Sequence, residues 1–180
     1  MKKLLIPFFV LVISLNISSQ NGRNGPSLWE EIRANSNLNY DNTKPQIIEA
    51  LKKYDSHQYL INRLSKNGQR YLFYTVSEAL KRDLPVELSL IPFIESQFDP
   101  YAQSSTGASG IWQFIPSTAI ENGLKKNWWY DARRDIVAST EAAYNFLVKL
   151  HQEHDDWLIA IAAYNAGPSR VRKELSLIHI

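Results

Sequence analysis

Glu95 is the residue whose surroundings in this sequence most favour acid–base chemistry. We expect a helix that begins at Pro85, and one face of it carries Leu84, Leu88, Ile91, Glu95 and Phe98 at steps of four and three. A carboxyl group placed among apolar side chains has a raised pKa, and a glutamate still protonated near neutral pH can act as a general acid. Taken alone, this pattern favours a structural glutamate paired with arginine or with backbone groups.

The residues after this helix add a second element with chemical potential. Positions 104–110 read Ser-Ser-Thr-Gly-Ala-Ser-Gly, which is too small and flexible for a helix, and positions 111–116 read Ile-Trp-Gln-Phe-Ile-Pro. Glycines let a backbone approach a ligand closely. Trp112 and Gln113 would give a sugar a stacking face and hydrogen-bonding groups. The same composition also fits a packed turn.

A third element lies at the end of a predicted helix. The segment 162–167 reads Ala-Ala-Tyr-Asn-Ala-Gly, so the phenol of Tyr164 and the amide of Asn165 stand among small residues. Small neighbours leave room for either a ligand or a closely packed helix.

Composition and charge exclude several function classes. The 180 residues contain no cysteine, which excludes a disulfide scaffold, thiolate metal sites and a cysteine nucleophile. The formal net charge is +2, from 20 basic and 18 acidic residues, and without Lys2 and Lys3 the two counts are equal. This balance gives no electrostatic indication of nucleic-acid binding, for which a basic stripe is expected. We expect no metal and no cofactor, and we place His151 and His154 on a solvated helix face. The four histidines form no convincing ligand set: His57, His151, His154 and His179.

The first residues resemble an export signal. Lys2 and Lys3 precede an apolar run at positions 4–17, and small polar residues follow. We predict a signal peptide at 1–20, with an uncleaved anchor as the alternative because there is no clean Ala-x-Ala site. The run is shorter than the roughly 20 residues of a membrane-spanning helix. We therefore expect an exported chain in the periplasm or cell envelope of a bacterium.

Helix signals recur along the remaining chain, whereas strand alternation does not. The sequence predicts an all-α fold, with a linker and helical prefix over 21–80 and a catalytic domain over 81–174. Expected starts and stops include Pro45, Ser56, Pro85, Pro116, Asp135 and Asp155 or Asp156 as starts, and Gly68, Gly123 and Gly167 as stops, with a further helix over 71–82. We expect residues 175–180, Leu-Ser-Leu-Ile-His-Ile, to be a non-native tail that truncates the domain.

An ordered set of motifs resembles one enzyme family. The motifs are Glu95-Ser96, Phe98-x-Pro100-x-Ala102-x-Ser104, Gly107-Ala108-x-Gly110-Ile111-x-Gln113, Pro116-x-Thr118 and Ala163-Tyr164-Asn165-Ala166-Gly167. Together they resemble the Slt-type lytic transglycosylases, glycoside hydrolase family 23. The segments 28–33, 71–74, 84–88 and 130–135 resemble its membrane-bound D subgroup. The resemblance covers roughly residues 27–174.

This resemblance implies a lysozyme-like helical fold and the glycan strand of peptidoglycan as substrate. The reaction would cleave the β-1,4 bond from N-acetylmuramic acid to N-acetylglucosamine and leave a 1,6-anhydromuramic acid end. Glu95 matches the single catalytic acid/base. The matching substrate-binding positions are Ser104, Gly110, Gln113, Ile115, Tyr164 and Asn165. The resemblance also implies a monomer, with membrane association in the parent protein.

A single carboxylate is consistent with this reaction, because ordinary glycosidases use two. The sequence departs from the family pattern at Trp112, where much of the wider family has Met. The family's downstream Glu-Thr…Tyr-Val segment and the wall-binding LysM repeats have no counterpart in this sequence. Two alternatives remain open: a hydrolytic muramidase with Asp99 or Glu121 as the second acid, and a non-catalytic glycan-binding module.

Overall fold

The computed structural model describes residues 27–38 and 68–178. The predicted leader at 1–20 and the helices expected from Pro45 and Ser56 lie outside the described residues.

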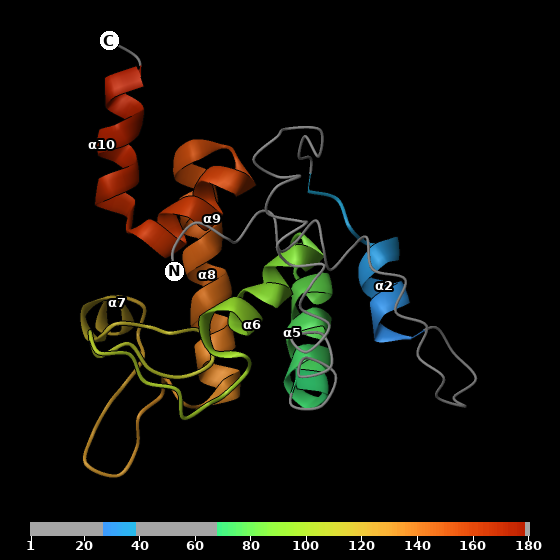
Figure 1. The fold of residues 1–180 in the computed structure, drawn as a ribbon, viewed down its shortest axis with the longest axis vertical. Helices are drawn as coiled ribbons and strands as arrows, with labels where there is room; N and C mark the ends of the chain where they lie inside the picture. Colours follow the sequence, from blue (N-terminus) through green and yellow to red (C-terminus); the bar gives the residue numbers. More distant parts are fainter. Residues whose placement is uncertain (1–26, 39–67, 179–180) are drawn as a thin grey trace. The chain divides into compact units, whose positions relative to one another are not determined.

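The all-α prediction is confirmed within the described ranges, which hold helices and no strand. The elements are α2 (Leu28–Ala34), α5 (Gln69–Lys81), the 3₁₀ helix η2 (Val86–Leu90), α6 (Ile91–Ser96), α7 (Pro116–Glu121), α8 (Ile136–His154), α9 (Trp157–Ala166) and α10 (Pro168–Ile178) (Figure 1). Isolated bridges join Gln103 to Ser109, Ser109 to Phe114, and Lys126 to Asp131. The chain forms two compact units that meet in sequence between Phe98 and Asp99.

In the first unit, local sequence signals account for α2 and α5. Ser27 and Glu30 form a capping box at the start of α2, in which each side chain bonds the other residue's backbone N–H. The helix predicted over 71–82 is confirmed as α5, and its buried residues include Leu72, Val76 and Ala79. Its other side carries Phe73, which is 63% exposed.

The single helix predicted from Pro85 is wrong in its detail. Pro85 instead precedes the short 3₁₀ helix η2, and α6 begins only at Ile91. The physical reason is Pro92, which has no N–H to donate to a carbonyl four residues earlier and whose ring would clash there. A proline is acceptable only in the first turn of a helix, so the α-helix restarts just before Pro92.

Glu87, on η2, binds the segment 36–38 that follows α2. Its side chain is fully buried. One carboxylate oxygen, Oε1, accepts hydrogen bonds from Ser36 Oγ at 2.6 Å, Asn37 N at 3.1 Å and Leu38 N at 3.0 Å. Because a buried carboxylate needs such donors, Glu87 ties segment 36–38 to η2.

The second unit is built from α7 to α10, and its predicted helix caps are confirmed. Asp135 accepts from the N–H groups of Val137 and Ala138 at the start of α8. Asp156 caps α9 in the same way, and Gly167 ends it. Helix α8 packs on α9, and α9 packs on α10. Short-range side chain–backbone contacts of this kind are readable from sequence.

Two features of this unit differ from expectation. Helix α10 was not predicted, although Pro168 at its first position is a start signal, and it includes residues 175–178 of the expected tail. The solvated face expected for the histidines is wrong for His154, whose side chain is only 10% exposed. His151 stacks its ring on Trp157, with ring centroids 4.1 Å apart.

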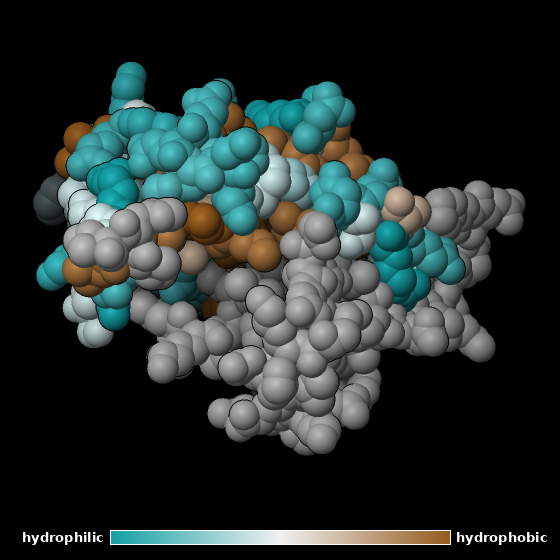
Figure 2. Space-filling view, turned by 90° about the horizontal axis from the view of Figure 1, so that it is seen from above, coloured by the Kyte–Doolittle hydropathy of each residue, from teal (hydrophilic) through white to brown (hydrophobic). Residues whose placement is uncertain are grey.

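One face of the molecule is shown in Figure 2, where hydrophilic residues cover most of the coloured surface and hydrophobic ones appear in several smaller patches. Among the described helices, none combines the length and apolar character that crossing a membrane requires.

The contacts of Glu87 lead to a stability prediction. Glu87→Ala removes the acceptor of three donors in a buried site, so the free energy of unfolding should fall by about 3 kcal/mol. Glu87→Gln keeps one acceptor oxygen and the side-chain shape, so its loss should be clearly smaller. Urea unfolding followed by circular dichroism measures both. A Glu87→Ala chain within 0.5 kcal/mol of wild type would contradict the anchoring role.

Candidate active site

Glu95 lies in the last turn of α6, in the first unit. Helix α6 ends sharply because Gln97 and Phe98 both adopt left-handed backbone, with φ of 55° and 59°. Phe98 is buried, whereas Glu95 is half-buried. The expectation of a Glu95 enclosed on an unbroken apolar helix face is therefore only partly right. A half-buried carboxyl remains within reach of a ligand.

The other predicted site residues belong to the second unit, and four of them lie on the segment Ser104–Ile115, here called the glycine loop. The loop folds on itself through Ser104. Its hydroxyl oxygen accepts from Ala108 N at 3.0 Å, and its own N–H donates to Ala108 O at 2.9 Å. The hydroxyl of Ser104 also shares a hydrogen bond with that of Thr106 at 2.9 Å. Ser104 therefore shapes the loop.

Gln113 also braces this loop. Its Nε2 donates to the carbonyls of Gly110 at 2.8 Å and Ala102 at 3.2 Å. Its backbone is left-handed, with φ of 51°, a conformation that a non-glycine residue keeps only where its surroundings enforce it. Its side chain is half-buried. Both amide hydrogens of Gln113 thus meet protein carbonyls.

The interpretation of Trp112 as a sugar-stacking face is wrong. Its side chain is fully buried, and its indole N–H donates to Thr140 Oγ1 at 3.0 Å on α8. Its ring meets that of Tyr144 edge-on, with centroids 5.3 Å apart. Trp112 is therefore a core residue that joins the glycine loop to α8.

Tyr164 and Asn165 lie near the end of α9, and both are half-buried. The hydroxyl of Tyr164 donates to the carbonyl of Trp112 at 2.8 Å. Its ring lies edge-on to those of Trp112 and Phe114 and tilted against Phe146. The structure thus brings Tyr164 together with the loop that carries Ser104, Gly110, Gln113 and Ile115. Ile115 precedes α7 and is 42% exposed.

Gly110 has a backbone reason to be glycine. Its φ is +81°, and a Cβ built on it would lie 1.7 Å from the carbonyl oxygen of Arg133. No side chain fits there. Because glycine has no side chain, the predicted substrate contact at this position would have to be made by backbone, and Gly110 is buried.

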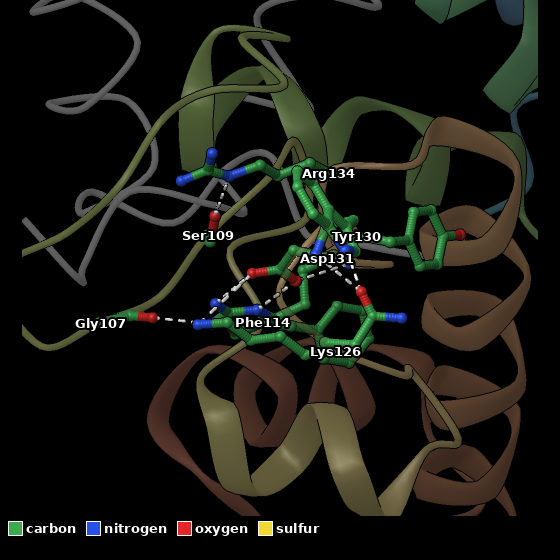
Figure 3. Close-up of polar contacts among 10 residues, drawn as sticks. Gly107, Ser109, Phe114, Lys126, Tyr130, Asp131 and Arg134 are labelled. Atoms are coloured by element: carbon green, nitrogen blue, oxygen red, sulfur yellow. Dashed lines mark hydrogen bonds and ion pairs between the residues drawn. The ribbon is translucent and has the colours of Figure 1, made fainter.

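Arg133 is the residue that sequence reasoning missed. It is 4% exposed, and its guanidinium donates to the carbonyls of Gly107 at 2.8 Å and Phe114 at 3.2 Å (Figure 3). Two more of its bonds go to the carboxylate of Asp131, at 2.9 Å and 2.7 Å. The adjacent Arg134 is exposed and reaches Ser109 Oγ at 3.2 Å. Because two arginines are adjacent in the sequence, the sequence alone does not indicate which of them is buried.

The two acids considered for a hydrolytic mechanism are exposed side chains. Asp99 accepts from Tyr101 N at 2.9 Å in a local turn, and Glu121 is the last residue of α7. Across the described ranges, no group of three or more His, Asp or Glu side chains could hold a metal ion.

The family match decides how this set of residues is interpreted. The model of the transglycosylase SLT domain matches residues 75–177. The chain belongs to the transglycosylase SLT family. The match includes Glu95, the whole glycine loop and the Tyr164-Asn165 pair.

Individual SLT relatives agree with this assignment. The membrane-bound lytic murein transglycosylase D of Escherichia coli (strain K12) is 44% identical over 131 residues, which is 72% of this chain and 29% of that protein. An Alteromonas sp. (strain M-1) protein named for tributyltin chloride resistance is 46% identical over 115 residues, 63% of this chain and 56% of that protein. The membrane-bound lytic murein transglycosylase F of Desulfosudis oleivorans is 35% identical over 92 residues, 47% of this chain and 19% of that protein. This chain thus spans less than a third of the E. coli relative.

The contact of Gly110 leads to a prediction with a matched control. Gly110→Ala combines positive φ with a clash against backbone, so the loss of unfolding free energy should exceed about 3 kcal/mol. Gly123→Ala has a similar φ of +77° and open space around the Cβ, so it should cost only about 1 kcal/mol. Thermal unfolding measures both. Equal losses in the two variants would show that the approach to Arg133 is unimportant.

A second prediction concerns acid stability. The Arg133 guanidinium, through its hydrogen bonds, holds the pKa of Asp131 below the ordinary value of 3.8. Because the folded-state pKa is lower than the unfolded-state one, this stabilisation is present above about pH 4 and is lost as the pH falls through the folded-state pKa. Asp131→Asn should therefore lower stability at pH 7 by roughly 3 kcal/mol and flatten the loss between pH 4 and pH 2.

The measurement is urea unfolding repeated at several pH values. Asp155→Asn, which changes an exposed carboxyl at the end of α8, is the control and should keep the wild-type acid profile. If the unfolding free energy of Asp131→Asn fell with pH in parallel with that of wild type, the Asp131–Arg133 pair would not contribute to acid stability.

Proposed function

We propose that this chain is the catalytic part of a peptidoglycan lytic transglycosylase. It cleaves the β-1,4 bond between N-acetylmuramic acid and N-acetylglucosamine and leaves 1,6-anhydromuramic acid ends. The observation that carries the proposal is that one family match spans Glu95, the glycine loop and the Tyr164-Asn165 pair. The names of the E. coli and Desulfosudis relatives, both lytic murein transglycosylases, support it.

In the proposed reaction, Glu95 is first the acid and then the base. The protonated carboxyl of Glu95 gives its proton to the glycosidic oxygen as the bond to C1 breaks, which releases the C4 hydroxyl of N-acetylglucosamine. The N-acetyl group of the muramic acid stabilises the positive charge that develops at C1. The C6 hydroxyl of the same sugar then attacks C1 and yields its proton to the Glu95 carboxylate. Glu95 ends protonated again, and no water is consumed.

The C6 hydroxyl competes with water because it belongs to the same sugar ring. An intramolecular nucleophile has an effective concentration far above that of a free one. The protein's task is then to hold the sugar so that C6 faces C1. We assign this task to the glycine loop and to the Tyr164-Asn165 pair.

The contacts of the substrate-binding candidates refine their proposed roles. Ser104, Gly110 and Gln113 form hydrogen bonds within the glycine loop, and Gly110 leaves no room there for a side chain. We propose that these three residues shape the backbone that binds the sugar. Ile115, which is 42% exposed, offers apolar surface to a sugar ring. Tyr164 holds the Trp112 carbonyl and Asn165 adjoins it, so we propose that this pair positions loop and glycan together.

We further propose that the protein acts in the cell envelope of a bacterium, close to a membrane. The relatives from E. coli and Desulfosudis are named as membrane-bound, and the leader expected at 1–20 would export the chain. The surrounding wall then supplies glycan strands as the substrate.

Digestion of purified sacculi tests the reaction. Wild type should release muropeptides whose masses show anhydro ends, and Glu95→Gln should reduce the release rate at least ~100-fold, because the amide has no proton of suitable acidity to transfer. Glu121→Gln and Asp99→Asn change exposed acids and should keep near wild-type rates. Circular dichroism checks that all variants fold.

Two results would contradict the proposal. Reducing ends, with a large loss in Asp99→Asn or Glu121→Gln, would identify a hydrolytic muramidase. Equal binding to sacculi by wild type and Glu95→Gln, with no fragments released by either, would identify a non-catalytic glycan-binding module.

A further inference from the structure

The segment Lys125–Asp131 between α7 and α8, here called the tryptophan loop, has no role in the proposed reaction. It carries Trp128 and Trp129, which are 88% and 90% exposed and are the most exposed large apolar side chains of the described part of the chain. Tyr130 beside them is 43% exposed. In Figure 1 this segment, in orange, extends away from α7 and α8. Burying both indoles against another body would be strongly favourable.

The tryptophan loop is held in shape by its own hydrogen bonds. Asn127 N donates to Tyr130 O at 2.8 Å, and Asn127 Oδ1 accepts from the N–H groups of Trp129 at 2.9 Å and Tyr130 at 2.8 Å. The Tyr130 hydroxyl donates to Asp135 at 2.9 Å. At the loop's base, Asp131 is bound by the buried Arg133. A preformed loop loses little conformational entropy when it binds.

The arrangement of the two indole rings argues against a sugar platform. The rings of Trp128 and Trp129 are 6.4 Å apart and nearly perpendicular, at 86°. Stacking along a glycan needs aromatic faces in a common plane, whereas perpendicular exposed rings form a wedge. Such amphipathic rings are enriched at the membrane–water interface, where the ring is buried and the N–H meets the headgroups.

The charges around the tryptophan loop favour an anionic surface. Lys125 and Lys126 precede the two tryptophans and are exposed, and exposed Arg134 follows. The loop's one carboxylate, Asp131, is only 14% exposed; it pairs with Arg133, and Lys126 Nζ lies 3.9 Å from it. Exposed lysines beside interfacial aromatic residues attract the phosphates of anionic lipids.

We propose that the tryptophan loop inserts Trp128 and Trp129 into the headgroup region of a membrane leaflet that contains anionic phospholipid. Lys125 and Lys126 contact the lipid phosphates while the loop base stays outside. This contact is independent of the proposed reaction, because it involves neither Glu95 nor the glycine loop. It would hold the enzyme at a membrane surface without a covalent lipid.

Vesicle binding by the exported chain tests the proposal, with the N-terminus of each preparation defined by its mass. The vesicles are a roughly 3:1 mixture of phosphatidylethanolamine and phosphatidylglycerol. Replacing both Trp128 and Trp129 with Ala should weaken partitioning by about 10-fold or more. The control Phe73→Ala removes an exposed aromatic ring from α5 and should bind like wild type. Because these side chains are exposed, all variants should unfold at the wild-type temperature.

Tryptophan fluorescence reports on the tryptophan loop directly. Of the five tryptophans, none lies in residues 1–20. Trp29 and Trp112 are buried, and Trp157 is half-buried with its ring stacked on His151, which leaves Trp128 and Trp129 as the two exposed ones. Vesicles should shift the emission of wild type to shorter wavelength, and lipids brominated on their acyl chains should quench it. Both signals should disappear in the double variant. Lys125→Gln with Lys126→Gln should weaken binding at low salt and abolish most of the salt dependence.

Three outcomes would overturn the proposal. The first is a wild type that does not partition onto these vesicles, and the second is a double tryptophan variant that partitions as wild type does. The third is a double variant that loses binding to purified sacculi while its vesicle binding is unchanged, which would make the tryptophan loop a glycan contact. None of these results depends on the reaction of Glu95, so the reaction proposal would stand or fall separately.

Discussion

The buried guanidinium of Arg133 organises the second unit around the glycine loop. A charged group that is 4% exposed is tolerated only when its donors are paired. Here they meet one carboxylate and two backbone carbonyls, those of Gly107 and Phe114, which stand on either side of the glycine loop's turn. The Arg133 side chain thereby fixes the distance between the parts of the loop that contain Gly107 and Phe114. The backbone of the same arginine also excludes every side chain but hydrogen at Gly110.

In keeping with this arrangement, polar side chains of the glycine loop form hydrogen bonds with other groups of the protein. Ser104 and Gln113 bond to neighbouring backbone groups, and Trp112 lies in the core with its N–H on Thr140. Tyr164 reaches the same loop from α9 through the Trp112 carbonyl. A loop built in this way is formed before any ligand binds, which suits the proposed reaction, in which the hold on one sugar decides the outcome.

Much of the fold could be predicted because its signals are local. Asp135, Asp156 and Pro116 each satisfy or avoid backbone groups within one helical turn, and such signals can be read from neighbouring residues. The apolar spacing after Pro85 predicts one helix, but Pro92 interrupts it, so that a 3₁₀ helix precedes α6. The role of Trp112 could not be predicted because its partner Thr140 is 28 residues away in sequence. The same limit hid Arg133, which bonds residues 19 and 26 positions earlier.

The chain's own contacts form the glycine loop before any ligand binds. Amide hydrogen exchange followed by nuclear magnetic resonance tests it most directly, at the N–H of Ser109, which donates to Phe114 O, and that of Gly110, which donates to Ala102 O. The account predicts that both amides are protected in the glycan-free protein and change little when a muropeptide oligosaccharide is added. Exchange at the rate of an unstructured chain without glycan, with protection only after its addition, would contradict the account.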